Sequence, residues 1–127
     1  MDNWFDQFRG IARGILDGSS RKDPVCWMFV RSVRENQGLA TPAMGSLTSD
    51  QDMQGVVKDN VALRQTEAGV WCVALFKIHQ FDWHAGVVLP DLIEFIHLRR
   101  KSGLEISRLD NQFWQSLCPI FYDNQST

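Results

Sequence analysis

The feature that most constrains this chain is a change in its hydrophobic period near Gly69. Before that residue, apolar side chains recur at the spacing of an amphipathic helix, and after it they occur in short runs and alternations typical of strands. The first part predicts helices over residues 4–16 and 24–36, and a weaker third helix over residues 49–59.

The second part predicts a succession of short strands. We expect strands over residues 70–78, 83–89, 92–98, 104–109 and 120–122, with a short helical turn over residues 110–114. Helices followed by a meander of antiparallel strands predict an α+β fold in which the N-terminal helices pack on the sheet. With 127 residues and neither repeat nor linker, the chain is predicted to form a single domain over residues 1–127.

Charge and composition exclude several classes of function. The net charge of -2 argues against a nucleic-acid partner, and the short basic run over residues 99–101 is interpreted as a solvated loop. No apolar segment is long enough for membrane insertion, and the N-terminus does not resemble a signal peptide, so we expect synthesis in a cytoplasm. The cysteines and histidines lack metal-ligand spacing, so neither a metal nor a cofactor is expected.

Cys26 is the candidate nucleophile. It falls in the first turn of the second predicted helix, where Asp23 is the expected N-cap and Pro24 the first helical residue. The N-terminal end of a helix favours the thiolate, which is the nucleophilic form of cysteine. Position alone leaves a buried structural cysteine as the alternative.

Two histidines lie on neighbouring predicted strands. His84 is near the start of one and His97 near the end of the next, and the turn at Pro90-Asp91 predicts a register that places them opposite each other. A cysteine at a helix N-terminus followed by two such histidines is the papain-like arrangement. We therefore expect the Cys26 sulfur to face a ring nitrogen of His84, the base, with the orienting His97 behind that ring.

Five pieces of the chain extend this pattern. In order they are Cys26-Trp27 with Val30 and Arg31, the VALFK strand from Val73, His84-Ala85-Gly86, Phe95-Ile96-His97 before Gly103-Leu104-Glu105-Ile106, and Leu109-Asp110 with Trp114. Together they resemble NlpC-type cell-wall peptidases, especially members carried by phages. The resemblance implies a papain-like fold, with Cys26, His84 and His97 in the three catalytic positions.

The same resemblance implies a function and a setting. It predicts a phage tail-associated endopeptidase of peptidoglycan stem peptides, carried in the virion tail beside tail-tip or hub proteins, with Trp27 and Trp83 as substrate-cleft candidates. A contact-delivered bacterial amidase effector is one alternative. The other is a tail-tip structural protein with a vestigial peptidase fold, favoured by Val25 and Met28, where the family usually has an Asp or Asn and a small residue.

Overall fold

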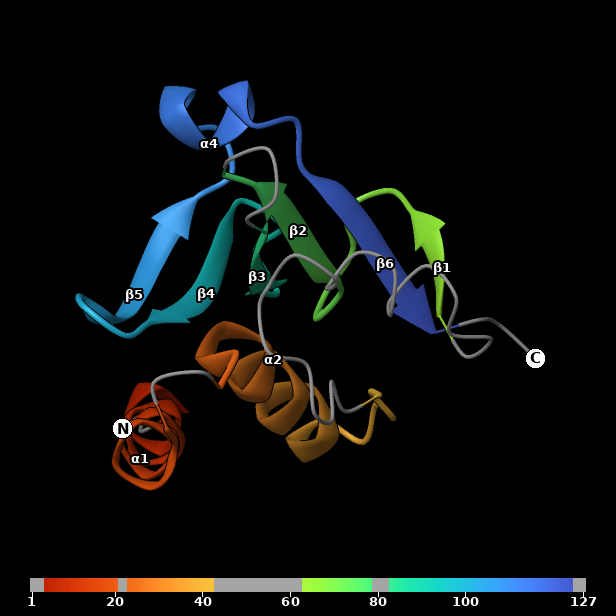
Figure 1. Cartoon of the computed structure of the whole chain (residues 1–127). Helices are drawn as coiled ribbons and strands as arrows, with labels where there is room; N and C mark the ends of the chain where they lie inside the picture. Colours follow the sequence, from red (N-terminus) through yellow and green to blue (C-terminus); the bar gives the residue numbers. More distant parts are fainter. Residues whose placement is uncertain (1–3, 21–22, 43–62, 79–82, 125–127) are drawn as a thin grey trace.

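The computed structural model describes residues 4–20, 23–42, 63–78 and 83–124. Its helices are α1 (Trp4–Gly18), α2 (Val25–Asn36) and α4 (Gln112–Ser116). Its strands are β1 (Leu63–Thr66), β2 (Val73–Lys77), β3 (Trp83–Val88), β4 (Glu94–Arg99), β5 (Gly103–Arg108) and β6 (Ile120–Asn124). The predicted α+β class is confirmed, and the helix predicted over residues 49–59 lies outside the described residues (Figure 1).

The six strands form one antiparallel sheet in the order β1-β6-β2-β3-β4-β5. From β2 to β5 the chain makes the predicted meander, but β6 returns to pair between β1 and β2. Strand β1 was not predicted, because only Leu63 of its four residues is buried and no alternation marks it. Its pairing with β6 depends on contacts from the far end of the chain.

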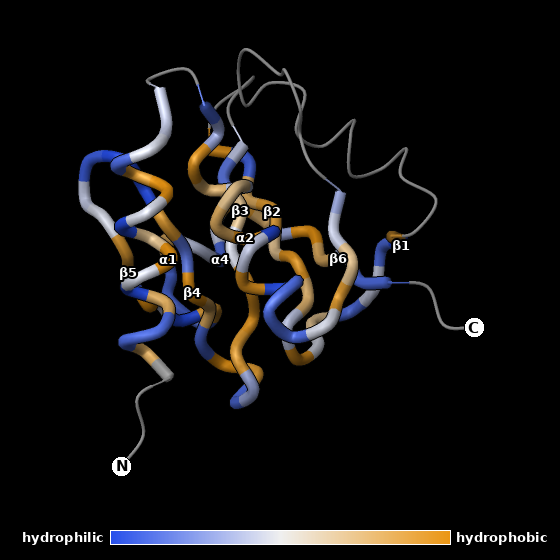
Figure 2. Tube along the Cα trace, turned by 90° about the horizontal axis from the view of Figure 1, so that it is seen from below, coloured by the Kyte–Doolittle hydropathy of each residue, from blue (hydrophilic) through white to orange (hydrophobic). Residues whose placement is uncertain are grey.

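Buried side chains cover both faces of the sheet. Helices α1 and α2 lie together against one face, as Figure 1 shows, and apolar residues follow the strands beside them in Figure 2. On the other face, α4 covers a smaller cluster made of Cys72, Ala74, Phe76, Val88, Phe95 and Trp114. Each large apolar side chain buried in this way stabilises the fold by about 1.5–3 kcal/mol.

Helix α2 begins close to the predicted position but with a different cap. Pro24 occupies the N-cap position, and no side chain caps the helix. The Asp23 carboxylate, predicted as the cap, instead accepts a hydrogen bond from the Ser20 backbone N–H at 2.8 Å. The prediction of Asp23 as the cap is therefore wrong, although Cys26 still lies in the first turn of the helix.

The short helix and the second strand also differ slightly from expectation. Helix α4 begins two residues later than predicted, after Asn111, whose side chain caps it by accepting the Phe113 N–H. Strand β2 begins at Val73, not at residue 70, because Trp71 has a positive φ of 64° that turns the chain before the strand.

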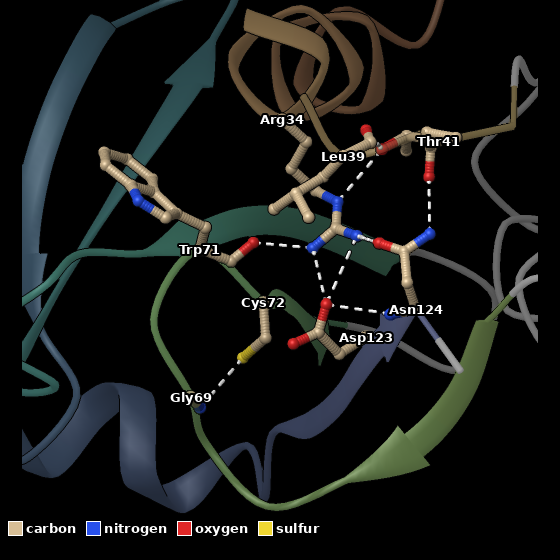
Figure 3. Close-up of polar contacts among 9 residues, drawn as sticks. Arg34, Leu39, Thr41, Gly69, Trp71, Cys72, Asp123 and Asn124 are labelled. Carbon is tan, nitrogen blue, oxygen red and sulfur yellow. Dashed lines mark hydrogen bonds and ion pairs between the residues drawn. The ribbon is translucent and has the colours of Figure 1, made fainter. Parts of the chain in front are cut away.

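A buried guanidinium ties the end of α2 to the sheet (Figure 3). Arg34 is 0% exposed; its Nε donates to Thr41 Oγ1 at 3.0 Å and its Nη1 to the Trp71 carbonyl at 2.6 Å. Both terminal nitrogens also reach Asp123 on β6 at 3.4 Å, and Nη2 donates to Asn124. One side chain thus joins three segments that are far apart in the sequence.

Candidate active site

A pocket of about 260 Å³ lies beside the first turn of α2, where β3 begins and β4 ends. The described residues that line it are Asp23, Val25, Cys26, His84, Leu98, Arg99 and Arg100. Cys26 comes from α2 and His84 from β3, and their side chains are 5% and 8% exposed. The fold therefore brings the candidate nucleophile and the candidate base to one small pocket.

The second histidine lies directly behind the first. His84 Nε2 is 2.8 Å from His97 Nδ1, and His97 Nε2 is 2.9 Å from Ser107 Oγ on β5. His84 Nε2 is thus engaged by His97, and His84 Nδ1 is the ring nitrogen left to accept a proton from a nucleophile. Ser107 was not identified from the sequence, because a serine on an exposed-looking strand carries no distinguishing signal.

The register between β3 and β4 differs from the predicted one by two residues. Val87 pairs with Ile96, which places Gly86, rather than His84, opposite His97. A shift of two keeps every side chain on its face, so the histidines are diagonal neighbours. Gly86 makes their contact possible, since a Cβ there would lie 3.3 Å from that of His97.

The two histidine rings lie on the sheet face that α4 covers. Trp114 is edge-on to His97 with ring centroids 5.2 Å apart, and Phe95 stacks on His97 at 4.6 Å. The body of α2 packs on the opposite face, so Cys26 and His84 share the pocket only because both lie at the end of the sheet.

Burial keeps both imidazoles neutral near pH 7. Desolvation, with a smaller effect of the Arg99 charge, lowers the pKa of His84 to about 3. Desolvation also lowers the pKa of His97 to about 2, and the repulsion that a protonated His84 and the Arg99 charge would exert adds to this effect. A neutral imidazole has one N–H and one lone pair, so the hydrogen-bonded chain must run in one direction. If His84 is to accept a proton at Nδ1, its Nε2–H donates to His97, and His97 Nε2–H donates to Ser107.

These lowered pKa values predict that the fold loses stability in mild acid. Between the folded pKa values and the unfolded value of about 6.5, the unfolded chain binds more protons than the folded chain. The free energy of unfolding is therefore highest above about pH 6.5 and falls as the pH decreases toward the folded pKa values. Each histidine contributes a slope approaching about 1.4 kcal/mol per pH unit.

Urea unfolding at pH 7 and pH 5 measures this effect while most carboxylates stay ionised. We expect the wild type to lose more free energy of unfolding than a variant with both His84→Gln and His97→Gln. Equal losses in the two proteins would contradict the assignment of neutral, buried histidines.

Gly86→Ala is expected to disturb the histidine pair. The new Cβ would lie 2.8 Å from Phe95 Cδ2, and that ring cannot retreat easily because Phe76 and Trp114 pack against it. We expect a loss of about 1–3 kcal/mol from overpacking and a shift of the His97 ring resonances in NMR spectra. Gly14→Ala is the control, since a Cβ there meets nothing within 4 Å; equal behaviour of both variants would refute the packing argument.

The substrate-cleft candidates do not line this pocket. Trp27 is 1% exposed, and its indole N–H donates to the Pro42 carbonyl at 2.8 Å, so it is a core residue. Trp83 is half-buried, with the Lys77 ammonium 5.9 Å from its ring centroid. Arg99 and Arg100 border the pocket, although the sequence pattern had placed them in a solvated loop; Arg99 in fact ends β4.

The described residues include no group of three potential metal ligands, and none of the described helices is long and apolar enough to cross a membrane. The α+β sheet is compatible with a papain-like fold without being specific to it. Comparison of the sequence with models of protein families and with curated proteins finds no match, so membership of the NlpC-type peptidases stays a prediction.

Proposed function

We propose that this chain is a cysteine amidase that cleaves stem-peptide bonds of peptidoglycan as part of a phage tail. The observation that carries the proposal is that Cys26 and His84 line one pocket, with His84 held by His97 and His97 held in turn by Ser107. The tail setting, with tail-tip or hub proteins as partners, rests on the motif resemblance.

The proposed reaction uses each of these residues in turn. His84 Nδ1 takes the thiol proton as the Cys26 sulfur attacks the amide carbon, and the same proton passes to the leaving amine as the C–N bond breaks. Water then hydrolyses the thioester, releasing a carboxylic acid and restoring the thiol. His97 acts as a positioning residue that keeps the His84 ring in place.

Two arginines and one acidic residue, Asp23, are among the described residues that line the pocket, so its charge balance favours a substrate carboxylate. Arg100 Nη2 donates to the Ser20 carbonyl at 2.6 Å, and the Arg99 guanidinium lies 5.0 Å from the Trp114 ring centroid. Both guanidinium groups are therefore held at the pocket, where they can bind carboxylates through their N–H donors. Peptidoglycan stem peptides carry such carboxylates.

A structural tail protein with a vestigial site is the second candidate. The observation that favours it is the burial of both histidines, which lowers the pKa of His84 to about 3 and makes it a weak base toward a thiol. Val25, where the family usually has an acidic or amide side chain, lines the pocket without adding a polar group.

Digestion of purified sacculi separates the two candidates. An active amidase releases new amino groups from walls of at least one bacterial class, and Cys26→Ala abolishes that release. Wild-type protein that assembles into tails but releases no amino groups from any wall class would refute the enzyme and favour the structural protein.

A further inference from the structure

A second pocket, of about 500 Å³, lies at the opposite end of β3 and β4. The first pocket includes His84 and Arg99, whereas the second includes Leu89 and Glu94, at the other ends of the same two strands. Six residues of strand span about 20 Å, so the two pockets are separate. The volume of the second lies within the usual range for small-ligand pockets, about 300–1,000 Å³.

One side of this second pocket is apolar and aromatic. Phe8 on α1 and Trp71 before β2 meet edge to face, with ring centroids 6.2 Å apart and planes at 70°. Leu89 and Pro90, from the turn between β3 and β4, extend the same wall. The surface is suited to a short hydrocarbon chain and to the face of a charged group.

The backbone of Trp71 is held in an unusual conformation. Its φ of 64° lies in the left-handed region, which is strained for a bulky residue. Two hydrogen bonds fix it: the Trp71 N–H donates to the Val88 carbonyl at 2.7 Å, and its carbonyl accepts from Arg34 Nη1 at 2.6 Å. Figure 3 shows the indole pointing away from that guanidinium. Strained residues held in this way concentrate at ligand sites.

The other side of the pocket is acidic. Asp91 Oδ1 accepts the backbone N–H groups of Ile93 and Glu94, both at 2.9 Å, which lowers the pKa of Asp91. Glu94 also lines the pocket, as do the uncharged Gln7 and Gln37, and the described lining residues include no lysine or arginine. Arg108 lies opposite Glu94 in the sheet and is the nearest cation in that strand pair. Its guanidinium donates two hydrogen bonds to the Asp110 carboxylate, at 2.8 and 2.7 Å.

We propose that this second pocket binds a primary ammonium group carried on an apolar stem, such as a lysine-type side chain. The stem lies on Pro90, since Phe8 and Leu89 are only 1% and 3% exposed, and the ammonium lies near the Trp71 ring and the carboxylates of Asp91 and Glu94. An ammonium that meets an aromatic ring and two carboxylates satisfies both its charge and its N–H donors. This binding is independent of the hydrolysis proposed above.

Titration with two matched probes tests the proposal. Nα-acetyl-lysine methylamide carries the ammonium, and Nα-acetyl-norleucine methylamide has a similar stem without it. The readout is the Trp71 indole N–H signal in an NMR spectrum, assigned with a Trp71→Phe variant. We expect saturable shifts with the lysine probe and binding about tenfold weaker, or weaker still, with the norleucine probe.

Charge-removing variants locate the binding. Asp91→Asn keeps the oxygen that accepts the two backbone N–H bonds, so together with Glu94→Gln it removes charge and leaves the turn intact. We expect this double variant to bind the lysine probe at least about fivefold more weakly, and the exposed control Asp17→Asn to bind like the wild type. Cys26→Ala should also leave binding unchanged. Equal affinity for both probes, the absence of any saturable shift, or an unaffected double variant would overturn the proposal.

Discussion

Cys26→Ser is expected to abolish hydrolysis of peptidoglycan peptides while leaving the fold intact. The hydroxyl is close to the thiol in size, but it stays protonated beside a neutral imidazole and is a poor nucleophile. We expect the rate of amino-group release from sacculi to fall by about a thousandfold or more. His84→Ala should lose nearly as much, because nucleophile and base act as a unit and their losses do not add.

Two further variants separate chemistry from structure in the same assay. His97→Ala should cost less activity than His84→Ala, because water can replace part of its contact with the His84 ring. Cys118→Ser is the matched control, since Cys118 is exposed and lies outside the pocket. If Cys26→Ser retained wild-type activity, or if Cys118→Ser lost it, Cys26 would not be the nucleophile.

The burial of the histidines gives this proposed chemistry a particular form. Because both imidazoles are neutral, a resting ion pair between thiolate and imidazolium is disfavoured, and the proton must move as the substrate is attacked. A substrate carboxylate bound by the arginines would reduce the unfavourable effect of the Arg99 charge on a protonated His84. Substrate binding and proton transfer are therefore expected to be coupled.

Local patterns predict much of the fold and part of the site. The helical period placed α1 and α2, and alternating apolar residues placed β2 to β5 within about three residues. The pairing of His84 with His97 followed from a short turn and the two-residue period of a strand, which is why a register error of two left them in contact.

The features that escaped prediction depend on contacts between distant segments. Ser107 matters only because β5 pairs with β4 and places its hydroxyl beside His97. The role of Gly86 depends on Phe95 across the strand pair, and nothing local distinguishes it from other glycines. Arg34 sits among the polar residues of an amphipathic helix, and its burial goes with contacts to Trp71 and to Asp123 on β6, which are distant in the sequence.

Arg34→Met is expected to cause the largest loss of stability outside the two pockets. The methionine keeps an apolar stem but leaves the Trp71 carbonyl, Thr41 Oγ1 and the Asn124 side chain without the donors they now have. Desolvation lowers the pKa of the guanidinium, and the carboxylate of Asp123 opposes that effect. Removing one member of a buried charged network costs about 3–5 kcal/mol, and we expect the lower end because the Asp123 side chain is 35% exposed.

Urea unfolding measures this loss as a lower denaturation midpoint with an unchanged slope. A second arginine on the same helix provides the control. Arg31→Met also removes a guanidinium, but the Arg31 side chain is 45% exposed. It has a surface ion pair with Glu35 at 3.4 Å, and its Nε donates one hydrogen bond to the Thr41 carbonyl at 3.0 Å. Its loss should therefore be about 1–2 kcal/mol. Similar losses in the two variants would show that the Arg34 network adds nothing beyond a surface pair. A loss of about 3 kcal/mol for Arg34→Met, clearly above that of Arg31→Met, would support a stabilising role for the buried network that joins α2 to Trp71 and to β6.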